Sequence, residues 1–582
     1  MYSHLEEVQI VVAGLKAYGI REVVMAPGGS DMPIMHSVET DPFFRCHSVV
    51  DERSLVYFAM GLAQEKGETV ACVCTSGTAV ANFLPGIVEA HYQDVPLVAI
   101  TADKNPRYLD QLETQKIDQR NIFGDWVKCS VDMPVVQSRA DHVLGMRLVK
   151  TALAEVRHHG IGPVHINVPI VGNDAVYDVR ELPQCEPYIF ETPQTFLEDG
   201  WVSYAKRLEG KKVLLVIGQN VSFSSEDAQA VDVFANEWDC AVAVEHLSNL
   251  KLDRSFNMYP VSEVCASVLG KEFLPDVVVS VGNNYASSAV KLFLRKNRSA
   301  IEHWAVSESG IPRDTYDALR VVFECSPSFF FAHFPRGERG SASTGYFDLW
   351  KAKRLGVSFG DIPLSGLYVG KTLAKSIPRG SILHLAVLNS IRVVQLFELD
   401  ECVKTYANVG ALGIDGCLSS FLGQAAASTD KLAYCLIGDL SFFYDMNAAS
   451  LRDVGNNVRI IMLNNGGGSE FHYYMGERNV PTIDNYICAR NGRVAKEWVE
   501  SVGFSYRSAR SKEEVDAGLE ALSKPSEAPL FLEVFTDMRD DAEVLREAYK
   551  KASPTDLKTS VKNAAKSVLS PKQIGSIKRL LG

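Results

Sequence analysis

The stretch that decides the fold is Leu436–Phe471, which reads LIGDLSFFYDMNAASLRDVGNNVRIIMLNNGGGSEF. Two apolar runs, 432–437 and 458–463, predict buried strands, and the residues between them predict a helix. A strand, a helix and a second apolar strand are typical of a βαβ unit in a parallel sheet that is buried on both faces. Asp439 and Asn465 follow the two strands. Because ligands of such sheets lie beyond the carboxyl ends of the strands, we expect both side chains at one edge.

The polar groups at this edge are those that bind a hard divalent cation. Asp439 offers a carboxylate, Asn465 an amide oxygen, and the glycine turn at 466–468 a backbone carbonyl. Mg²⁺ accepts such an incomplete shell of protein oxygens when phosphate oxygens complete it. The helix predicted over 440–452 carries Ser441 in its first turn, and a helix start of this kind can donate to a phosphate. An ordinary βαβ unit with polar strand ends is the alternative interpretation.

The rest of the chain alternates apolar runs and amphipathic segments, as parallel α/β domains do. We expect helices over 3–19, 55–64 and 79–92 in the first domain. The expected strands are 22–25, 43–50, 70–74, 95–101 and 164–168 in that domain, 212–217, 240–244, 277–281 and 303–306 in a second, and 382–387, 405–408, 432–437, 458–463 and 530–534 in a third.

These elements predict an α/β protein of three doubly wound parallel-sheet domains. The expected domain ranges are 1–181, 194–335 and 363–553, with linkers at 182–193 and 335–362. No GxGxxG motif follows a strand of the central domain, so dinucleotide binding is not predicted there. Residues 554–582 are rich in Lys and Ser and carry apolar residues at roughly helical spacing, which predicts a basic amphipathic tail.

Composition argues against three classes of protein: nucleic-acid-binding, secreted and membrane-spanning. The chain has 582 residues, 46% of them hydrophobic, and a net charge of −12, which argues against a nucleic-acid partner. Its 12 cysteines are scattered without metal-ligand spacing and are typical of reduced thiols in a cytoplasmic protein. The N-terminal segment carries acidic residues and no basic region, so no secretory signal is expected. No apolar run reaches the ~18 residues that a transmembrane helix needs.

Glu52 is the second candidate group for chemistry. It follows the strand predicted over 43–50, and the sequence Asp51-Glu52-Arg53 is by itself most often a solvated loop or a helix start. If Glu52 lies beside a metal–phosphate site, a catalytic role becomes the better interpretation, because a buried carboxylate can act as an acid or base near neutral pH.

Several segments carry a family resemblance: 51–53, 75–82, 101–103, 164–169, 413–416, 438–448 and 464–467. With them the chain resembles the thiamine diphosphate (ThDP)-dependent enzymes, and among these the menaquinone-pathway synthases of 2-succinyl-5-enolpyruvyl-6-hydroxy-3-cyclohexene-1-carboxylate (SEPHCHC). The resemblance covers the first and third domains strongly and the central domain weakly. It implies the domain order pyrimidine-binding, central, diphosphate-binding. It also implies at least a homodimer, in which Glu52 and Asp439 face each other across a subunit boundary.

Residue by residue, the resemblance implies the following roles. Glu52 contacts N1′ of the aminopyrimidine of ThDP and activates the cofactor, Gln115 lies near the reaction centre, and Ile414 supports the bent conformation of the cofactor. The implied ligands of Mg²⁺ (or Mn²⁺) are Asp439, Asn465 and the carbonyl of Gly467. The implied cofactor-binding residues are Pro27, Gly28, Thr78, Ile414, Gly438, Asp439, Leu440, Ser441 and Asn465.

The chain departs from the family where the synthases hold two anionic substrates with arginines. Arginine positions of the family are occupied here by Ser30, Lys104, Val394 and Val409. Neither Val nor Ser can imitate a bidentate guanidinium–carboxylate pair, whose loss typically costs ~2–5 kcal/mol. Cations that are able to replace these arginines are Lys116, Arg120, Arg392 and Lys404. The expected substrate-contact positions are Gly29, Ser30, Lys104, Ser390, Arg392 and Val409.

The sequence therefore predicts a ThDP- and Mg²⁺-dependent decarboxylase or carboligase with a rebuilt, less arginine-rich substrate pocket. Its expected partners are a 2-oxo acid donor, an unidentified acceptor and a second copy of the chain. Two alternatives stay open. One is SEPHCHC synthase itself, acting on 2-oxoglutarate and isochorismate with displaced anion-binding residues. The other is a non-catalytic scaffold, against which the joint presence of Glu52, Asp439 and Asn465 argues.

Overall fold

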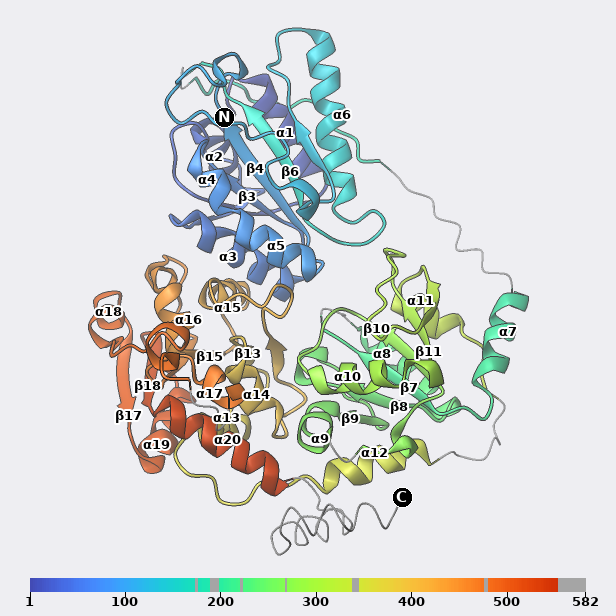
Figure 1. Cartoon of the computed structure of the whole chain (residues 1–582). Coiled ribbons are helices and arrows are strands. Elements are labelled where there is room, and N and C mark those ends of the chain that lie inside the picture. The colour runs from blue at the N-terminus through green and yellow to red at the C-terminus, as the bar shows by residue number, and fades with distance from the viewer. Residues whose placement is uncertain are drawn as a thin grey trace, which may run out of the picture.

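The computed structural model describes residues 1–172, 176–188, 198–219, 223–266, 269–337, 345–475 and 480–552. Within these ranges it contains three six-stranded sheets, and the strands that pair within each sheet run parallel. Figure 1 shows the three sheets in three bodies, with the first domain above the other two. The predicted fold class, α/β with three parallel sheets, is confirmed. The tail predicted over 554–582 lies outside the described residues.

The first sheet has the strand order β2-β1-β3-β4-β6-β5. Its strands are β1 (Glu22–Met25), β2 (Arg45–Ser48), β3 (Val70–Cys74), β4 (Leu97–Asp103), β5 (Ser130–Asp132) and β6 (Val164–Pro169). Its helices are α1 (Glu6–Ala17), α2 (Met32–Glu39), α3 (Glu52–Lys66), α4 (Thr78–Asn82), α5 (Leu84–Tyr92) and α6 (Arg139–Glu155). The central strands β3 and β4 are buried along their whole length, as expected for apolar strands covered on both faces.

The second sheet has the order β12-β11-β10-β7-β8-β9. Its strands are β7 (Val213–Ile217), β8 (Ala241–Val244), β9 (Ser255–Asn257), β10 (Val277–Val281), β11 (Glu302–Val306) and β12 (Leu319–Phe323). Its helices are α7 (Glu198–Leu208), α8 (Ser225–Glu237), α9 (Met258–Cys265), α10 (Ser288–Lys296), α11 (Pro327–His333) and α12 (Tyr346–Leu355).

The third sheet has the order β14-β13-β15-β16-β18-β17. Its strands are β13 (Ile382–Leu385), β14 (Lys404–Tyr406), β15 (Ala433–Gly438), β16 (Val458–Asn464), β17 (Ser505–Ala509) and β18 (Leu530–Phe535). Its helices are α13 (Gly366–Ser376), α14 (Asn389–Gln395), α15 (Cys417–Ala427), α16 (Asp439–Tyr444), α17 (Ser469–Met475), α18 (Lys496–Ser501), α19 (Lys512–Leu522) and α20 (Met538–Ala552). The predicted βαβ unit is β15, α16 and β16.

Three predictions about single elements were wrong. The helix predicted over 440–452 ends at Tyr444 and continues as a 3₁₀ turn at Met446–Ser450, after Asp445, whose buried carboxylate accepts the Ser419 N–H of α15. The helix predicted over 79–92 is two helices, α4 and α5, since a proline near the start of α5 lacks the N–H that a continuous helix needs. Residues 335–362, predicted as an irregular linker, include α12, whose aromatic face is buried against the central domain.

Four strands were missed, and all four lie at sheet edges: β5, β9, β12 and β17. Each has three to five residues, and their side chains are partly exposed. An edge strand that is half-exposed carries polar residues and no continuous apolar run, so apolar periodicity does not detect it.

Two further expectations from composition concern the state of the cysteines and the length of the apolar helices. All 12 cysteines are unpaired, as predicted for reduced thiols. In the described part of the chain, no helix is both long and apolar enough to cross a bilayer.

The first and third domains share one apolar core at the crossing of α3 and α15. Glycines allow the two helices to approach closely. A Cβ at Gly423 would lie 2.1 Å from the carbonyl oxygen of Phe58, and a Cβ at Gly61 would lie 2.0 Å from that of Ser420. Figure 1 shows α3 at the base of the first domain, directly above α15. This contact places the start of α3 beside the carboxyl edge of the third sheet.

We expect Gly423→Ala to lower the thermal stability of the protein. The added methyl group has no room between α15 and the backbone of α3, and overpacking of this kind typically costs ~1–3 kcal/mol. Thermal unfolding measures the effect, with Gly360→Ala as the control because a Cβ at Gly360 meets open space. Equal unfolding temperatures for the two variants would contradict the close helix crossing.

Candidate active site

Asp439 lies at the carboxyl end of β15 and begins α16, where its side chain is only 2% exposed. Its Oδ1 accepts a 2.8 Å hydrogen bond from the Leu440 N–H, and its Oδ2 accepts one of 3.1 Å from Asn491 Nδ2. Burial raises the pKa of Asp439 to about 6, while Asn491 and the N–H groups of Leu440, Gly466 and Gly467 oppose this rise. Asp439 and the glycine turn therefore lie together, as the sequence predicts.

Asn465 presents its amide oxygen to the same turn because a half-buried acid, Asp541, holds the other end of its amide. Asn465 Nδ2 donates to Asp541 Oδ2 at 3.1 Å, which leaves Oδ1 on the side of the Gly467 N–H, 3.4 Å away. Asp541 is itself held by the Gly366 N–H and the Thr536 hydroxyl, each at 2.9 Å. Asp541 therefore orients Asn465, a predicted metal ligand. Asp541 itself was not predicted from the sequence, because it lies in α20, far along the chain from Asn465.

The glycine turn has a backbone that only glycine readily adopts. Gly466 has φ 81° and Gly467 has φ 153°, and a Cβ at Gly467 would lie 2.7 Å from the Cys488 carbonyl oxygen. Hydrogen bonds from the Gly468 N–H to Cys488 O (2.7 Å) and from the Asn491 N–H to Gly466 O (2.9 Å) fix the turn. Asn491 thus links the turn to Asp439, a role that no sequence pattern indicated.

The loop that carries Ile414 is held from both domains. The Ser441 hydroxyl in α16 donates to the Ile414 carbonyl at 2.9 Å. From the first domain, the buried carboxylate of Glu89 accepts the N–H groups of Gly410 (2.9 Å) and Ala411 (2.7 Å). Ile414 is half-buried against the core that the two domains share. Glu89 is a second positioning residue that sequence reasoning missed.

Glu52 is the first residue of α3, and its two successors bind the third domain. Asp51 caps the helix by accepting the N–H groups of Arg53 and Ser54. The Arg53 guanidinium donates to the carbonyl of Tyr444 at 3.2 Å, and the Ser54 hydroxyl donates to Asp445 Oδ1 at 3.2 Å. These contacts bring the half-buried Glu52 to the helix that begins at Asp439. Among the described residues, no hydrogen bond engages the Glu52 carboxylate.

Asp445 is the acceptor on which this contact between domains converges. Its fully buried carboxylate accepts the Ser419 N–H and hydroxyl, both at 2.8 Å, besides the Ser54 hydroxyl. Burial raises the pKa of Asp445 to about 7, against the opposing effect of Ser419 and Arg53. Helix α3, helix α15 and the end of α16 therefore meet at one carboxyl group.

Within a single chain, the residues after Glu52 thus contact the far end of the helix that begins at Asp439. The resemblance implies instead that Glu52 and Asp439 face each other across a subunit boundary. Contacts within one chain do not test that arrangement, and it stays a prediction.

The predicted cofactor and catalytic residues Pro27, Thr78 and Gln115 belong to the first domain. Pro27 is exposed, and Thr78 is exposed at the start of α4. The exposed Gln115 donates from Nε2 to the Ser76 carbonyl at 2.9 Å. The buried Gln119 accepts the Gly77 N–H at 3.1 Å, so this second glutamine supports the turn beneath Gln115.

The cations named as replacements for the missing arginines all have acidic partners. Arg392 pairs with Glu470 and also donates to Asn389 Oδ1 at 2.9 Å. The other pairs are Lys104 with Glu113 (3.3 Å), Lys116 with Asp103 (2.7 Å), Arg120 with Asp118 (2.8 Å) and Lys404 with Glu65 (3.2 Å). All five cations are therefore already paired with acids of the chain, and none of them is left unpaired to bind a substrate carboxylate.

The other predicted substrate positions carry no charge. Gly29 is exposed, and Ser30 shares a 3.3 Å hydrogen bond with the Ser76 hydroxyl. Ser390 and Val409 are buried, and the Val409 carbonyl accepts Asn284 Nδ2 of the central domain at 2.8 Å.

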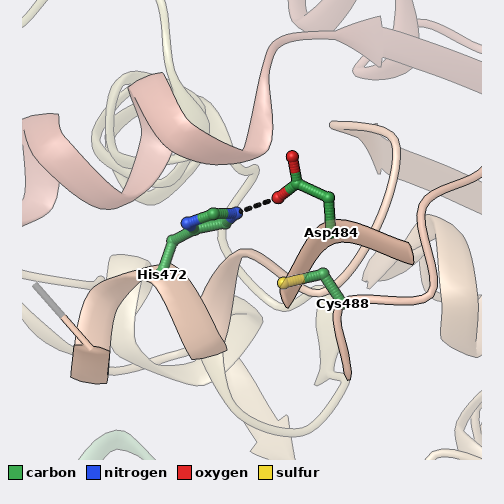
Figure 2. A group of neighbouring side chains, drawn as sticks. All are labelled: His472, Asp484 and Cys488. Atoms are coloured by element: carbon green, nitrogen blue, oxygen red, sulfur yellow. Dashed lines mark hydrogen bonds and ion pairs between the residues drawn. The ribbon is translucent and has the colours of Figure 1, made fainter. Parts of the chain in front are cut away.

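A second group of potential metal ligands lies beside the glycine turn. His472, Asp484 and Cys488 each offer one ligand atom, and these atoms lie within 4.8 Å of one another (Figure 2). His472 Nε2 and Asp484 already form a 2.8 Å hydrogen bond, and the Arg539 guanidinium pairs with the other oxygen of Asp484. A cation bound there would face that guanidinium. We interpret the group as a brace for α17.

Comparisons with known proteins show the family of the chain and the likeness of its fold. Residues 6–122 match the family model "Thiamine pyrophosphate enzyme, N-terminal TPP binding domain". The chain is 34% identical over 559 residues to the SEPHCHC synthase of Phocaeicola vulgatus, covering 94% of this chain and 99% of that relative. It is 31% identical over 532 residues to the SEPHCHC synthase of Desulfotalea psychrophila, covering 90% and 96%.

Among solved structures, benzoylformate decarboxylase from Polynucleobacter necessarius is similar in fold. The TM-score is 0.68, and the match covers 92% of this chain and 99% of that one. The identity is 16%, so this likeness concerns the fold alone.

We expect Asp445→Asn to destabilise the protein more at pH 5 than at pH 8. The folded-state pKa of Asp445 is raised from 3.8 to about 7, so the stability that the protonated carboxyl contributes is lost as the pH rises toward 7. The Asn side chain does not titrate, so the deficit of the variant shrinks over that range. Thermal unfolding from pH 5 to pH 8 measures it, with the exposed Asp430→Asn as the control. A deficit that is independent of pH would refute the assignment.

Proposed function

This chain belongs to the thiamine diphosphate-dependent enzymes, as a relative of the SEPHCHC synthases, and on that premise we propose that it decarboxylates a 2-oxo acid with the help of ThDP and Mg²⁺. The family makes or breaks carbon–carbon bonds. We propose that the fragment left after loss of CO₂ is joined to an acceptor, because the relatives that match most of the chain are synthases. A 2-oxo acid donor and an acceptor are then the partners of the site.

One observation carries the proposal: the residues next to Glu52 are bonded to the segment that follows Asp439. Arg53 reaches the Tyr444 carbonyl, and Ser54 reaches Asp445. A cofactor that spans the two domains needs a carboxylate on one side and an anion-binding edge on the other. The contact between α3 and α16 supplies that arrangement.

The groups at the edge of the third sheet fit a hard cation and a diphosphate. Asp439 contributes a carboxylate, Asn465 an amide oxygen that Asp541 orients, and Gly467 a carbonyl. All three are oxygen donors, and no thiol or imidazole is among them, which favours Mg²⁺ or Mn²⁺. Ser441 and the first turn of α16 would hold the diphosphate together with Gly438 and Leu440.

ThDP, when bound, supplies the electron sink for cleavage of the bond next to the carbonyl. The residues of the chain bind it, orient it and move its protons. The side chain of Glu52, which has no hydrogen-bond partner among the described residues, would exchange a proton with N1′ of the aminopyrimidine ring, donating as a carboxyl group and accepting as a carboxylate. Ile414, held by Ser441 and by the Glu89 clamp on its loop, would support the ring from below. Pro27, Gly28 and Thr78 would line the pyrimidine side, and Gln115 would face the reaction centre.

We propose a substrate pocket with less positive charge than that of the synthases. Four arginine positions of the family carry Ser30, Lys104, Val394 and Val409, and the replacement cations are paired with acids. A donor with one carboxylate group fits such a pocket better than a dicarboxylate does. The second candidate is SEPHCHC synthesis itself, which the 34% identity over 94% of the chain favours.

The two candidates are separated by one set of assays. The purified protein with ThDP and Mg²⁺ is offered a panel of 2-oxo acids, and CO₂ release is followed. We expect release from a monocarboxylic 2-oxo acid to exceed release from 2-oxoglutarate with isochorismate. The reverse order would favour SEPHCHC synthesis, and no release from any acid would favour a non-catalytic scaffold.

Glu52→Gln should lower the rate of CO₂ release by about 10²–10⁴-fold, because the amide cannot exchange a proton with the cofactor. The protein should keep its unfolding temperature, since the carboxylate has no hydrogen-bond partner in the described structure to lose. Glu68→Gln, at an exposed site two residues beyond α3, is the control. Full activity of Glu52→Gln would refute the role of Glu52.

Asp541→Asn should lower the affinity for Mg²⁺ by about 10–100-fold, so that ThDP binding needs a higher Mg²⁺ concentration, the usual effect of losing a group that orients a metal ligand. The Asn variant loses the acceptor that turns the Asn465 amide, so the amide oxygen no longer points reliably toward the metal. Calorimetric titration of ThDP at several Mg²⁺ concentrations measures the effect. The exposed neighbour Asp540→Asn is the matched control, and identical titrations would contradict the role of Asp541.

We propose that the protein self-associates, with Glu52 of one copy facing Asp439 of another, as the family resemblance implies. In that case a mixture of Glu52→Gln chains and Asp439→Ala chains, refolded together, regains activity that neither variant shows alone, because one site in each mixed dimer keeps both groups. A mixture that stays inactive would confine the site to a single chain. A cytoplasmic location and the lack of a nucleic-acid partner remain predictions.

A further inference from the structure

His47 is a histidine of strand β2 that the proposed function does not use. Its two ring nitrogens contact carboxylates of two different domains. Nε2 lies 3.0 Å from Oε2 of Glu22, which belongs to β1 of the first domain. Nδ1 lies 3.0 Å from Oδ2 of Asp453, which follows the 3₁₀ turn of the third domain. His47 therefore bridges the two domains that are proposed to hold the cofactor.

The geometry of this bridge requires a charged ring. A neutral imidazole donates from one nitrogen and accepts at the other, whereas an ionised carboxylate only accepts. Two carboxylates at hydrogen-bond distance, one on each nitrogen, are both satisfied only when each nitrogen carries a proton. The imidazole of His47 is therefore an imidazolium that lies between Glu22 and Asp453.

The Glu22 side of the bridge is a buried cluster of charges. The Glu22 side chain has no exposed surface, and besides His47 it pairs with Arg45 of β2 and with Lys66 at the end of α3. Burial by itself would raise the pKa of Glu22, but the hydrogen bonds from His47 and Lys66 lower it to about 2. Glu22 is therefore an anion that always accepts from the ring of His47 at neutral pH.

The Asp453 side of the bridge is more open. The side chain of Asp453 is partly exposed, whereas that of His47 is mostly buried and its ring faces Phe58 of α3, with ring centroids 5.6 Å apart. Burial by itself would lower the pKa of His47, but the hydrogen bonds to Asp453 and Glu22 raise it to about 9. This direction agrees with the proton that the geometry requires on each nitrogen.

The bridge lies on the segment that leads to Glu52. His47 belongs to β2, which comes shortly before Glu52 in the chain, and Arg53 and Ser54 come directly after it. Arg53 and Ser54 are bonded to the same stretch of the third domain as His47, namely 444–453. Because no hydrogen bond in the described part of the chain engages the Glu52 carboxylate, its position depends on these two attachments.

We propose that His47 is a positioning residue for the proposed reaction: as a cation between two carboxylates, it pins the chain before Glu52 to the third domain. The contacts of Arg53 and Ser54 alone would let the first domain pivot about the start of α3. The second attachment removes that freedom and holds Glu52 at one distance from the edge that carries Asp439. The inference rests on the proposed function for its meaning, but the docking can be measured without cofactor or substrate.

The first test compares thermal unfolding of the cofactor-free wild type, His47→Gln, Asp453→Asn and the double variant from pH 6 to pH 10. The stabilisation by the bridge is complete below the unfolded-state pKa of about 6.5 and is lost as the pH rises through the folded-state pKa of about 9. We expect His47→Gln to unfold at a lower temperature than the wild type near pH 6, and this deficit to shrink toward pH 10.

The two single variants should not be additive, because both remove the same contact. Asp453→Asn should show a deficit that shrinks over the same pH range, and its partly exposed position makes it a second measurement if His47→Gln folds poorly. The control is His4→Gln, at an exposed histidine whose ring contacts a backbone carbonyl. A deficit that is independent of pH, additive deficits, or an equal deficit in His4→Gln would overturn the inference.

A kinetic measurement then links the bridge to the proposed reaction. With ThDP, Mg²⁺ and a 2-oxo acid, His47→Gln should lower kcat by up to about 10²-fold near neutral pH, the effect of a small misplacement of a reacting group. KM should stay unchanged, because His47 contacts acids of the chain and not the substrate. The ratio of variant to wild-type kcat should rise toward 1 as the pH passes about 9, where the wild type loses the bridge as well.

A kcat ratio that does not change with pH would reduce His47 to a structural role and overturn the inference. Absence of CO₂ release in the wild type would instead reject the proposed function, and the unfolding measurements would still decide whether His47 docks the two domains.

Discussion

One buried carboxyl group holds the two halves of the site together. Asp445 accepts hydrogen bonds from Ser419 on α15 and from Ser54 on α3, while the neighbouring Arg53 reaches the carbonyl of Tyr444. Such a group costs free energy to bury unless its donors are all in place. These contacts dock the first domain on the third so that Glu52 lies near the end of the helix that begins at Asp439. The glycines at the crossing of α3 and α15 allow the two helices to approach closely, and the hydrogen bonds of Asp445 hold them in their relative position.

Polar side chains also hold one another in place around the predicted metal-binding edge of the third sheet. Asp541 turns the amide of Asn465, Asn491 joins Asp439 to the glycine turn, and Glu89 clamps the loop that carries Ile414. Asp439, Asn465 and the loop of Ile414 are each held by a polar side chain that would not itself touch the cofactor. Preorganisation of this kind means that cofactor binding need not reorder the site.

Much of this could be predicted from the sequence, for physical reasons that can be named. The central strands of each sheet are apolar runs, and the rule that ligands lie at the carboxyl edge places Asp439 and Asn465 together. The short edge strands were missed because they carry no such run. Asp445, Asp541, Asn491 and Glu89 were missed as site residues because their partners lie far away in the sequence, and no local pattern marks an acid that will be buried. Likewise, only the structure shows that Arg392 is already paired with Glu470.

The most direct measurement is an experimental structure of the protein with ThDP and Mg²⁺. The account predicts that one coenzyme molecule contacts both domains, with its pyrimidine ring against the carboxylate of Glu52 and its diphosphate beside a metal held by Asp439 and Asn465. A coenzyme bound to the third domain alone, with Glu52 turned to solvent, would contradict the central claim.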